Sequence, residues 1–246
     1  IFGWQHLQLD QVSRIKQGFI ELGHEIVDNN EDFIYCHDSS QYDNAINYHL
    51  QTNKKNKLLL KVLDLGIHCG NNLNKLKEKL LFADIILANS IKVQTHIKEY
   101  LNLGSFVVYD AVKDVSFIPN SKKQIDFLAL GRLNDSFKRT HLIKELSLFP
   151  EYENKSFIFC GPENPGFGFY YGIVDDDYLN KVYNAAKICL CVSKYEGLYL
   201  PPLETCVAGC VPIICSDMST CDELNLPEFV CQPTVDSINN KVREIE

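Results

Sequence analysis

The chain has 246 residues, 46% of them hydrophobic, and carries a formal net charge of −8. This length suits one large domain or two domains of about 120 residues each. The charge argues against a broad interface for nucleic acid, because phosphate contacts need clustered lysine and arginine. No apolar stretch reaches the ~20 residues that span a bilayer, which leaves peripheral membrane contact open.

Ten cysteines are present. Cys160, Cys189, Cys191 and Cys215 lie inside apolar runs, and no Cys-x-x-Cys pair occurs, so a zinc ribbon is poorly supported. Because cysteine behaves as a small buried hydrophobe, we expect reduced core thiols, with disulfides or a metal as the alternative. The sequence opens on IFGW rather than on a signal peptide. These features together predict a cytoplasmic protein.

Strand-like and helix-like segments alternate through the first half of the chain. Short apolar runs predict strands at residues 1–4, 24–27, 32–36, 57–65, 84–88 and 105–112. Helical spacing and stop or cap residues predict helices at residues 12–22, 73–80 and 90–101. This alternation is typical of a parallel sheet covered by helices on both faces.

The pattern breaks at residues 113–124, where Pro, Asn, Ser and Lys predict a linker. It then restarts. Strands are predicted at residues 125–130, 156–160, 188–193, 211–215 and 228–231. Helices are predicted at residues 140–149, 176–186, 202–208 and 219–224, and from 237 onward. We therefore expect an α/β protein with an N-terminal Rossmann-like domain at 1–115 and a C-terminal one at 120–246. Two such domains facing each other would enclose a ligand cleft, because open parallel sheets bind at the carboxyl ends of their strands.

Two common nucleotide motifs are missing. No Gly-x-Gly-x-x-Gly follows an early strand, and no phosphate loop ending in Gly-Lys-Ser/Thr is present. The glycine-rich stretch PGFGFYYG at 165–172 has neither spacing, so we interpret it as a mobile loop. A dinucleotide site is poorly supported.

A basic pair follows the strand at 125–130. Gly131 ends that strand, Arg132 stands at its carboxyl tip, and Lys138 comes just before the next helix. Helix N-termini favour anions, and the two side chains add full positive charges there. Taken alone, the pair also fits an ordinary surface loop.

Two acids follow the strand at 188–193, in the stretch YEGLYLPPLETCVAGCVPIICSD at 195–217. Glu196 lies in the loop at the carboxyl edge, Gly197 lets a ligand approach the backbone, and Glu204 stands near the start of a helix. Carboxylates at these places can accept sugar or ribose hydroxyls. The plainer alternative is a solvated Glu196 and a Glu204 that supports the helix N-terminus.

Taken together, these motifs resemble the retaining glycosyltransferase family 4, also called glycosyltransferase group 1. Its pattern places two glutamates with seven residues between them inside E-G-F-G-L-P-x-L-E-A-x-x-x-G-x-P-V-I. The matching positions are Glu196, Gly197, Leu200, Pro201, Glu204, Gly209, Pro212 and Ile213. The resemblance covers most of the chain and is strongest from 126 to 217.

The resemblance implies the GT-B fold and a hexosyltransferase that acts with retention in glycan biosynthesis. The donor would be a UDP- or GDP-sugar, held mainly by the C-terminal domain, and the acceptor a glycan, lipid or small molecule. Arg132 and Lys138 would bind the diphosphate, Glu196 the donor sugar and Glu204 the ribose. Further donor contacts are expected from Gly131, Gly197, Leu198, Tyr199 and Leu200. No metal or other cofactor is expected, because the basic pair neutralises the leaving group.

The chain departs from the family pattern in several places. The Gly-Gly loop after the first strand is reduced to Gly3, and Tyr199 and Arg139 stand where the family has glycines. The family's N-domain histidine has no unambiguous match; we take His68 as the candidate, with Asp64 and His37 as alternatives. The chain is also short for the family, so the acceptor side is expected to be reduced.

These departures keep three alternatives open. The first is a catalytically degenerate module that binds a nucleotide sugar, and the second is a sugar-nucleotide epimerase or hydrolase of similar architecture. The third is a glycosyltransferase acting on DNA bases, which the acidic net charge disfavours.

Overall fold

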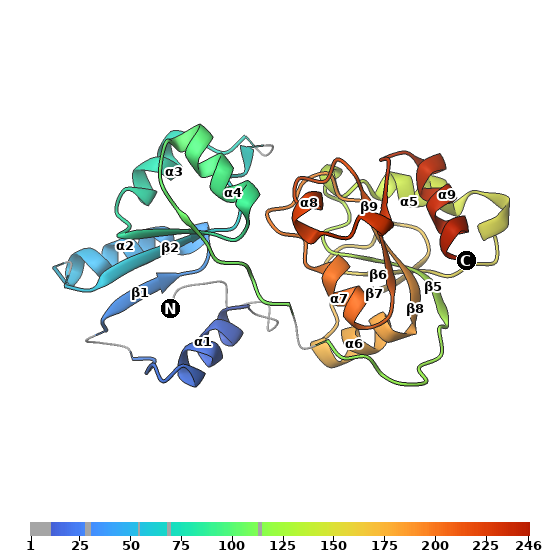
Figure 1. Ribbon diagram of the computed structural model, residues 1–246, viewed down its shortest axis with the longest axis horizontal. Coiled ribbons are helices and arrows are strands. Elements are labelled where there is room, and N and C mark those ends of the chain that lie inside the picture. Colours follow the sequence, from blue (N-terminus) through green and yellow to red (C-terminus); the bar gives the residue numbers. More distant parts are fainter. Residues whose placement is uncertain (1–10, 28–30, 54, 68–69, 113–114) are drawn as a thin grey trace. The chain divides into compact units, whose positions relative to one another are not determined.

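The computed structural model describes residues 11–27, 31–53, 55–67, 70–112 and 115–246. The chain divides into two compact units, residues 1–111 and 112–246. Each unit is an α/β layer structure built on a parallel sheet (Figure 1). The predicted fold class, with two parallel sheets and helices between the strands, is confirmed.

Unit 1 contains a four-stranded parallel sheet in the order β1-β2-β3-β4. Its strands are β1 Phe33–Cys36, β2 Lys57–Val62, β3 Ile85–Ala88 and β4 Phe106–Val107. Its helices are α1 Gln11–Glu21, α2 Tyr42–Gln51, α3 Leu73–Leu80 and α4 Ile91–His96, the last continued by a π-helical turn, Ile97–Leu101. Asn72 and Ser90 cap α3 and α4, each accepting a hydrogen bond from the backbone three residues on.

Unit 2 contains a six-stranded parallel sheet in the order β10-β9-β8-β5-β6-β7. Its strands are β5 Ile125–Leu130, β6 Phe157–Cys160, β7 Phe169–Gly172, β8 Ala186–Cys191, β9 Val211–Cys215 and β10 Val230–Cys231. Its helices are α5 Thr140–Ser147, α6 Asp176–Ala185, α7 Pro201–Val207, α8 Cys221–Leu224 and α9 Val235–Ile245. Chain order reverses direction at β5, where β6 and β7 extend to one side and β8, β9 and β10 to the other. This is the doubly wound Rossmann order, whose switch point is the usual place for a ligand.

Both faces of the second sheet are buried, because successive strand residues point to opposite sides. Leu128 and Leu130 pack into the core beneath α6 and α8, whereas Phe127 and Ala129 pack into the core beneath α5 and α9. The strands therefore read as continuous apolar runs in the sequence.

The described cysteines carry free thiols, and all but Cys206 are buried. Cys160, Cys189 and Cys191 lie in one core and Cys215 in the other, as the apolar runs predict. Burial raises the pKa of Cys160 to about 11 and that of Cys36 to about 12. These thiols are therefore protonated packing groups at neutral pH.

Two predictions made from the sequence are wrong. Residues 24–27 form no strand; His24 instead packs edge-on against Phe19 and Phe33, with ring centroids 5.7 and 6.0 Å apart. The supposed mobile loop at 165–172 contains strand β7, which pairs with β6. This strand has only four residues, the last of them Gly172, which is too few for a clear period-2 pattern.

The segment expected to be a linker is fastened to unit 2. The backbone amide of Ser116 donates to Asn180 Oδ1 at 3.1 Å, and that of Ile118 donates to Asn184 Oδ1 at 2.7 Å. Phe117 lies against Gly209, at the end of α7. Side-chain amides on α6 thus hold a segment that composition alone marks as a free connection. The strand predicted at residues 1–4 lies outside the described residues.

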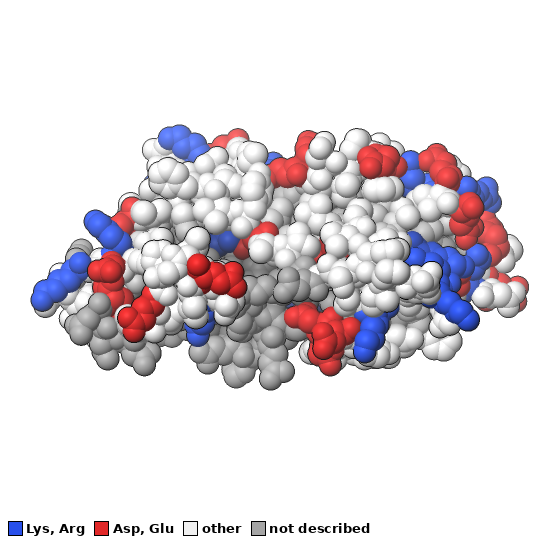
Figure 2. Space-filling model, turned by 60° about the horizontal axis from the view of Figure 1, so that its bottom comes forward, with Lys and Arg blue, Asp and Glu red and all other residues white. Residues whose placement is uncertain are grey.

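Many basic side chains are paired with acids. Lys187 contacts Asp126 at 2.6 Å, Lys155 contacts Glu246 at 2.8 Å, and Lys79 contacts Asp43 at 2.8 Å. Figure 2 shows acidic and basic side chains interspersed on the face in view. Across the part of the chain that the structure describes, no helix has both the length and the apolar character needed to cross a membrane.

Candidate active site

The switch point of the second sheet brings two loops together. β5 and β8 are adjacent, with Leu128 opposite Cys189, so the segments that follow them leave the same edge. The loop after β5 carries Gly131, Arg132 and Lys138, and the loop after β8 carries Glu196. The backbone N–H of Lys194 donates to the carbonyl of Phe137 at 2.8 Å, which joins the two loops directly.

Lys138 and Glu196 form the central pair of this edge. The Lys138 ammonium donates to Glu196 Oε1 at 2.5 Å, and the two side chains are only 11% and 17% exposed. The ammonium also lies 4.9 Å from the centroid of the Tyr199 ring. Burial keeps the pKa of Tyr199 well above its ordinary value, so this ring is a neutral wall beside the cation. The pair is thus largely shielded from water.

Arg132 is arranged differently. Its side chain is 66% exposed, and its Nε contacts Asp135 at 3.1 Å within the same loop. The guanidinium is solvent-exposed, although the Asp135 Oδ2 atom that it contacts is buried. An ion pair with one exposed partner is weak, so the guanidinium can be redirected at little cost. The structure thus places Arg132 at the same sheet edge as Lys138, but in a separate pair.

Two glycines allow close contacts to the backbone at the ends of β5 and β6. Gly131 has a φ of +111°, and a Cβ at that position would lie 3.3 Å from the Lys138 ammonium. Gly161, directly after β6, has a φ of +154°, and a Cβ there would lie 2.0 Å from the Gly131 carbonyl oxygen. Neither position tolerates a side chain without displacement. Gly161 was missed by the sequence analysis, although a glycine directly after a buried strand is a usable signal.

Glu204 lies in the first turn of α7, behind the loop. It is 3% exposed, and its Oε2 accepts a hydrogen bond of 2.7 Å from the Tyr183 hydroxyl. Burial and the neighbouring Glu204 carboxylate raise the pKa of Tyr183, so this hydroxyl stays a donor. Pro201 and Pro202 begin the helix where a missing N–H costs nothing. Glu204 is therefore oriented by Tyr183, a partner that no sequence signal indicated.

Ser219 holds the backbone of Glu196 in place. Its hydroxyl donates to the Glu196 carbonyl at 2.6 Å and accepts from the Glu196 N–H at 2.9 Å. The Ser219 N–H also donates to the Lys194 carbonyl at 3.2 Å. The loop after β9 is thus tied to the loop after β8. No sequence feature predicted a role for Ser219, because a serine in a loop of Ser, Asp and Thr carries no distinguishing mark.

Arg139 joins the loop after β5 to the loop after β9. It adopts a left-handed conformation, with φ of 52°, and both of its terminal nitrogens contact Asp217, with Nη1 2.8 Å from Oδ1. The hydrogen-bonded guanidinium holds the pKa of Asp217 below its usual range. A left-handed conformation favours glycine, and the bidentate pair offsets the strain of an arginine there.

The other predicted site residues are placed as follows. Gly197 and Leu198 are half-buried in the loop after β8, and Leu200 directly precedes α7. His68 lies outside the described residues. In unit 1, Asp64 accepts a hydrogen bond from the Gly66 amide at 2.8 Å, and His37 is buried with Tyr35 at 2.9 Å. In the described ranges, no group of three or more His, Cys, Asp or Glu could hold a metal ion.

Comparison with solved structures identifies the fold. The chain matches a sucrose-phosphate synthase from Thermosynechococcus elongatus with a TM-score of 0.71 and 15% identity, over 95% of this chain and 67% of that one. It matches HepE from Anabaena, in complex with UDP-glucose, with a TM-score of 0.71 and 14% identity, over 95% and 71%. This chain has the GT-B fold.

A third GT-B match is an α,α-trehalose-phosphate synthase (UDP-forming) from Burkholderia xenovorans, in complex with glucose-6-phosphate. The TM-score is 0.65 and the identity 12%, over 95% of this chain and 68% of that one. The chain therefore spans about two thirds of the length of these GT-B structures. No protein-family model and no curated protein matches the chain.

Proposed function

We propose that this chain is a glycosyltransferase that moves a hexose from a UDP- or GDP-sugar to an acceptor hydroxyl with retention of configuration. The observation that carries the proposal is the shielded Lys138–Glu196 pair at the switch point of a GT-B unit. A neighbour of the same fold holds UDP-glucose, which favours a UDP-sugar as the first donor to test.

In this proposal Lys138 changes partner when the donor binds. In the structure Glu196 neutralises the ammonium at 2.5 Å. A donor diphosphate takes over that role, and the released carboxylate accepts hydroxyls of the donor sugar. Negative charge grows on the diphosphate as the glycosidic bond breaks, so Lys138 binds the transition state more strongly than the ground state. Arg132, loosely held by Asp135, adds a second cation.

The remaining donor contacts are assigned by position. Tyr183 holds one oxygen of Glu204, and we assign the other oxygen to the ribose hydroxyls. The backbone amides of Gly197, Leu198 and Tyr199 would bind the diphosphate or sugar, with Leu200 beside them. Gly131 leaves room for the diphosphate near Lys138. In unit 1, we retain His68 as the candidate contact to the donor sugar.

We further propose that the reaction needs no divalent metal. Lys138 and Arg132 supply the positive charge that a metal would otherwise bring to the leaving diphosphate. Chelation by EDTA should therefore leave turnover unchanged. The acceptor class is a glycan, a lipid or a small molecule.

The test is nucleoside-diphosphate release from a panel of UDP- and GDP-hexoses by the purified chain, with and without added acceptors. Lys138→Ala and Glu196→Gln should abolish most of the release, whereas the exposed control Lys144→Ala should not change it. Full activity in both site variants would contradict the assignment of Lys138 and Glu196 to the donor site. Binding of UDP or GDP without turnover on any donor would favour the degenerate binding module, and an isomerised nucleotide sugar would favour the epimerase.

A further inference from the structure

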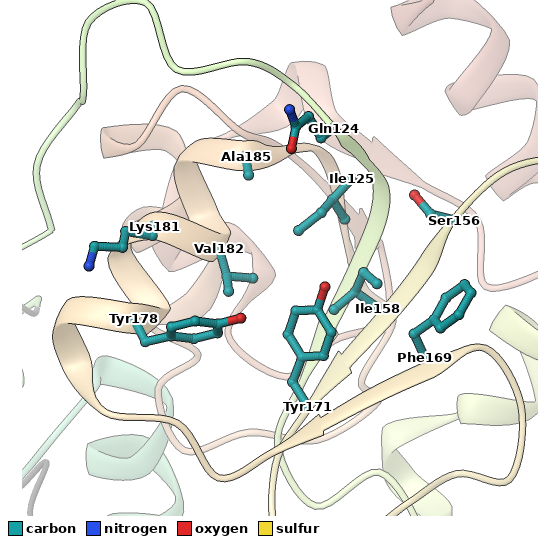
Figure 3. Close-up of a pocket in the computed structure, with 10 residues that line it drawn as sticks. All are labelled: Gln124, Ile125, Ser156, Ile158, Phe169, Tyr171, Tyr178, Lys181, Val182 and Ala185. Atoms are coloured by element: carbon teal, nitrogen blue, oxygen red, sulfur yellow. The ribbon is translucent and has the colours of Figure 1, made fainter.

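A groove of about 420 Å³ lies between α6 and β7 in unit 2. Gln124 and Ser156, which precede β5 and β6, line one end of it, so it opens toward the amino ends of the strands (Figure 3). Lys138 and Glu196 lie beyond the carboxyl ends of the same sheet. The groove is therefore a different place from the proposed donor site, and no role in that site accounts for it.

Aromatic side chains are left uncovered along this groove. Phe169 is 63% exposed, Tyr171 42% and Tyr178 45%. Tyr171 comes from β7 and Tyr178 from α6, and their rings meet edge to face with centroids 6.1 Å apart. Figure 3 shows the two rings converging over the hollow, with Ile158 and Val182 behind them. A stable core buries such rings, so an exposed group of three indicates a binding surface.

The polar groups of the groove favour a ligand without charge. Lys181 is the cation among the lining residues, and Figure 3 shows its ammonium directed away from the hollow. Asp175, Asp176 and Asp177 begin α6 directly before Tyr178, so an anion would meet repulsion at this end. The lining also offers the tyrosine hydroxyls and the Gln124 amide, which are neutral hydrogen-bonding groups.

We propose that this aromatic groove binds a neutral oligosaccharide. A pyranose ring has one face of C–H bonds, which pack on the negative face of an aromatic ring, and a rim of hydroxyls for neutral polar groups. The Tyr171–Tyr178 corner supplies the aromatic surface and Gln124 the amide. The volume falls within the ~300–1,000 Å³ of small-molecule sites. The site would anchor a sugar chain, and it does not require that the protein transfer sugar.

Two features argue against a second copy adding a strand at this edge. β7 has only four residues, and Gly168 and Gly172, with φ of +64° and +76°, bend the backbone at both ends. Such a short, glycine-bounded edge is a poor template for pairing. The Tyr170 hydroxyl also ties the strand to the Gly161 carbonyl at 2.8 Å.

The experiment is a glycan array of neutral, sialylated and sulfated oligosaccharides probed with the intact labelled chain, followed by calorimetry with the best neutral glycan. Tyr171→Ala and Tyr178→Ala should each weaken binding about tenfold. Tyr178→Phe keeps the ring and should weaken it less. The matched control is Ile173→Ala, which removes a side chain that is 60% exposed but does not line the groove.

Binding should be unchanged in Lys138→Ala, which separates this site from the donor site. The inference is overturned if no neutral glycan binds, if anionic glycans bind better, or if both alanine variants bind as well as the parent. A concentration-dependent dimer that Tyr171→Ala dissociates would also overturn it, by assigning the surface to a second copy. Tyr178 lies on a helix surface, so its variant keeps the test valid even if Tyr171→Ala does not fold.

Discussion

The ammonium of Lys138 lies 2.5 Å from a carboxylate oxygen of Glu196, although the two residues are 58 positions apart in the chain. This contact holds both side chains in place. Under the proposed function, a donor diphosphate would have to separate the pair to bind, so part of its binding energy would be used there. The same exchange would release Glu196 for sugar hydroxyls and so would couple donor binding to the organisation of the site.

Lys138→Ala should lower kcat by about ten- to hundred-fold, because a charge-assisted contact to the leaving group is lost. Lys138→Arg should recover part of the rate, since the charge is kept but the geometry changes. Initial-rate kinetics with a UDP-hexose measures both. An unchanged kcat in the alanine variant would show that this lysine does not contact the leaving group.

Glu196→Gln should reduce kcat/KM for the nucleotide sugar by about tenfold or more, because a carboxylate acceptor becomes a weaker amide. Affinity for the free nucleoside diphosphate should not fall, and it can rise, because Lys138 loses a competing anion. Calorimetry with UDP and with the intact donor separates the two effects. A parallel loss of UDP affinity would contradict the assignment of Glu196 to the sugar.

Ser219 should behave as a positioning residue. Ser219→Ala removes both hydrogen bonds to the Glu196 backbone, so kcat should fall about fivefold to tenfold while KM changes little. Ser219→Thr keeps the hydroxyl and should restore most of the rate. Ser147→Ala is the matched control, because that hydroxyl bonds only within α5. If Ser219 had a purely structural role, Ser219→Ala would lower the thermal midpoint without a selective fall in kcat at nearly constant KM.

The Arg139–Asp217 pair predicts a pH-dependent contribution to stability. The pKa of Asp217 is lowered in the folded protein, so the pair stabilises fully above the carboxyl's ordinary pKa of about 3.9 and is lost as pH falls through the folded pKa. Asp217→Asn should therefore lower the thermal midpoint at pH 7, and the difference from the parent should vanish in acid. A pH-independent difference would show that Asp217 acts by packing rather than by charge.

The cysteines should be unreactive in the native state. Burial raises the pKa of Cys160 and Cys36, and most described thiols are buried. Ellman's reagent should react slowly with the native chain and release ten thiols after denaturation. Fewer than ten would reveal a disulfide. Among the described cysteines, rapid reaction of one thiol would point to Cys206, which is partly exposed.

The strands at the centre of unit 2 could be predicted from the sequence. β5, β8 and β9 are buried on both faces, so each reads as a continuous apolar run. Edge and irregular segments could not be predicted in this way. Strand β7 is short and bounded by glycines. Residues 24–27 are apolar enough for a strand, but His24 packs against aromatic rings instead. The spacing of Glu196 and Glu204 did predict that one acid lies in a loop and the other near the start of a helix. That placement depends only on one loop and the first turn of the helix that follows it.

What the sequence by itself determined was the type and order of the elements in unit 2 other than β7, and the loops that carry its polar groups. A buried helix or strand shows a regular pattern of apolar residues in its own sequence. That pattern predicts the element without knowledge of the segment it packs against. Only the tertiary structure decided which loops meet. The reversal of strand order at β5 sets β8 beside it and so brings Lys138 to Glu196. Ser219 and Asp217 reach Glu196 and Arg139 across the same edge, and Tyr183 on α6 reaches Glu204 on α7. Such contacts depend on how crossovers place distant segments, and no local pattern records that.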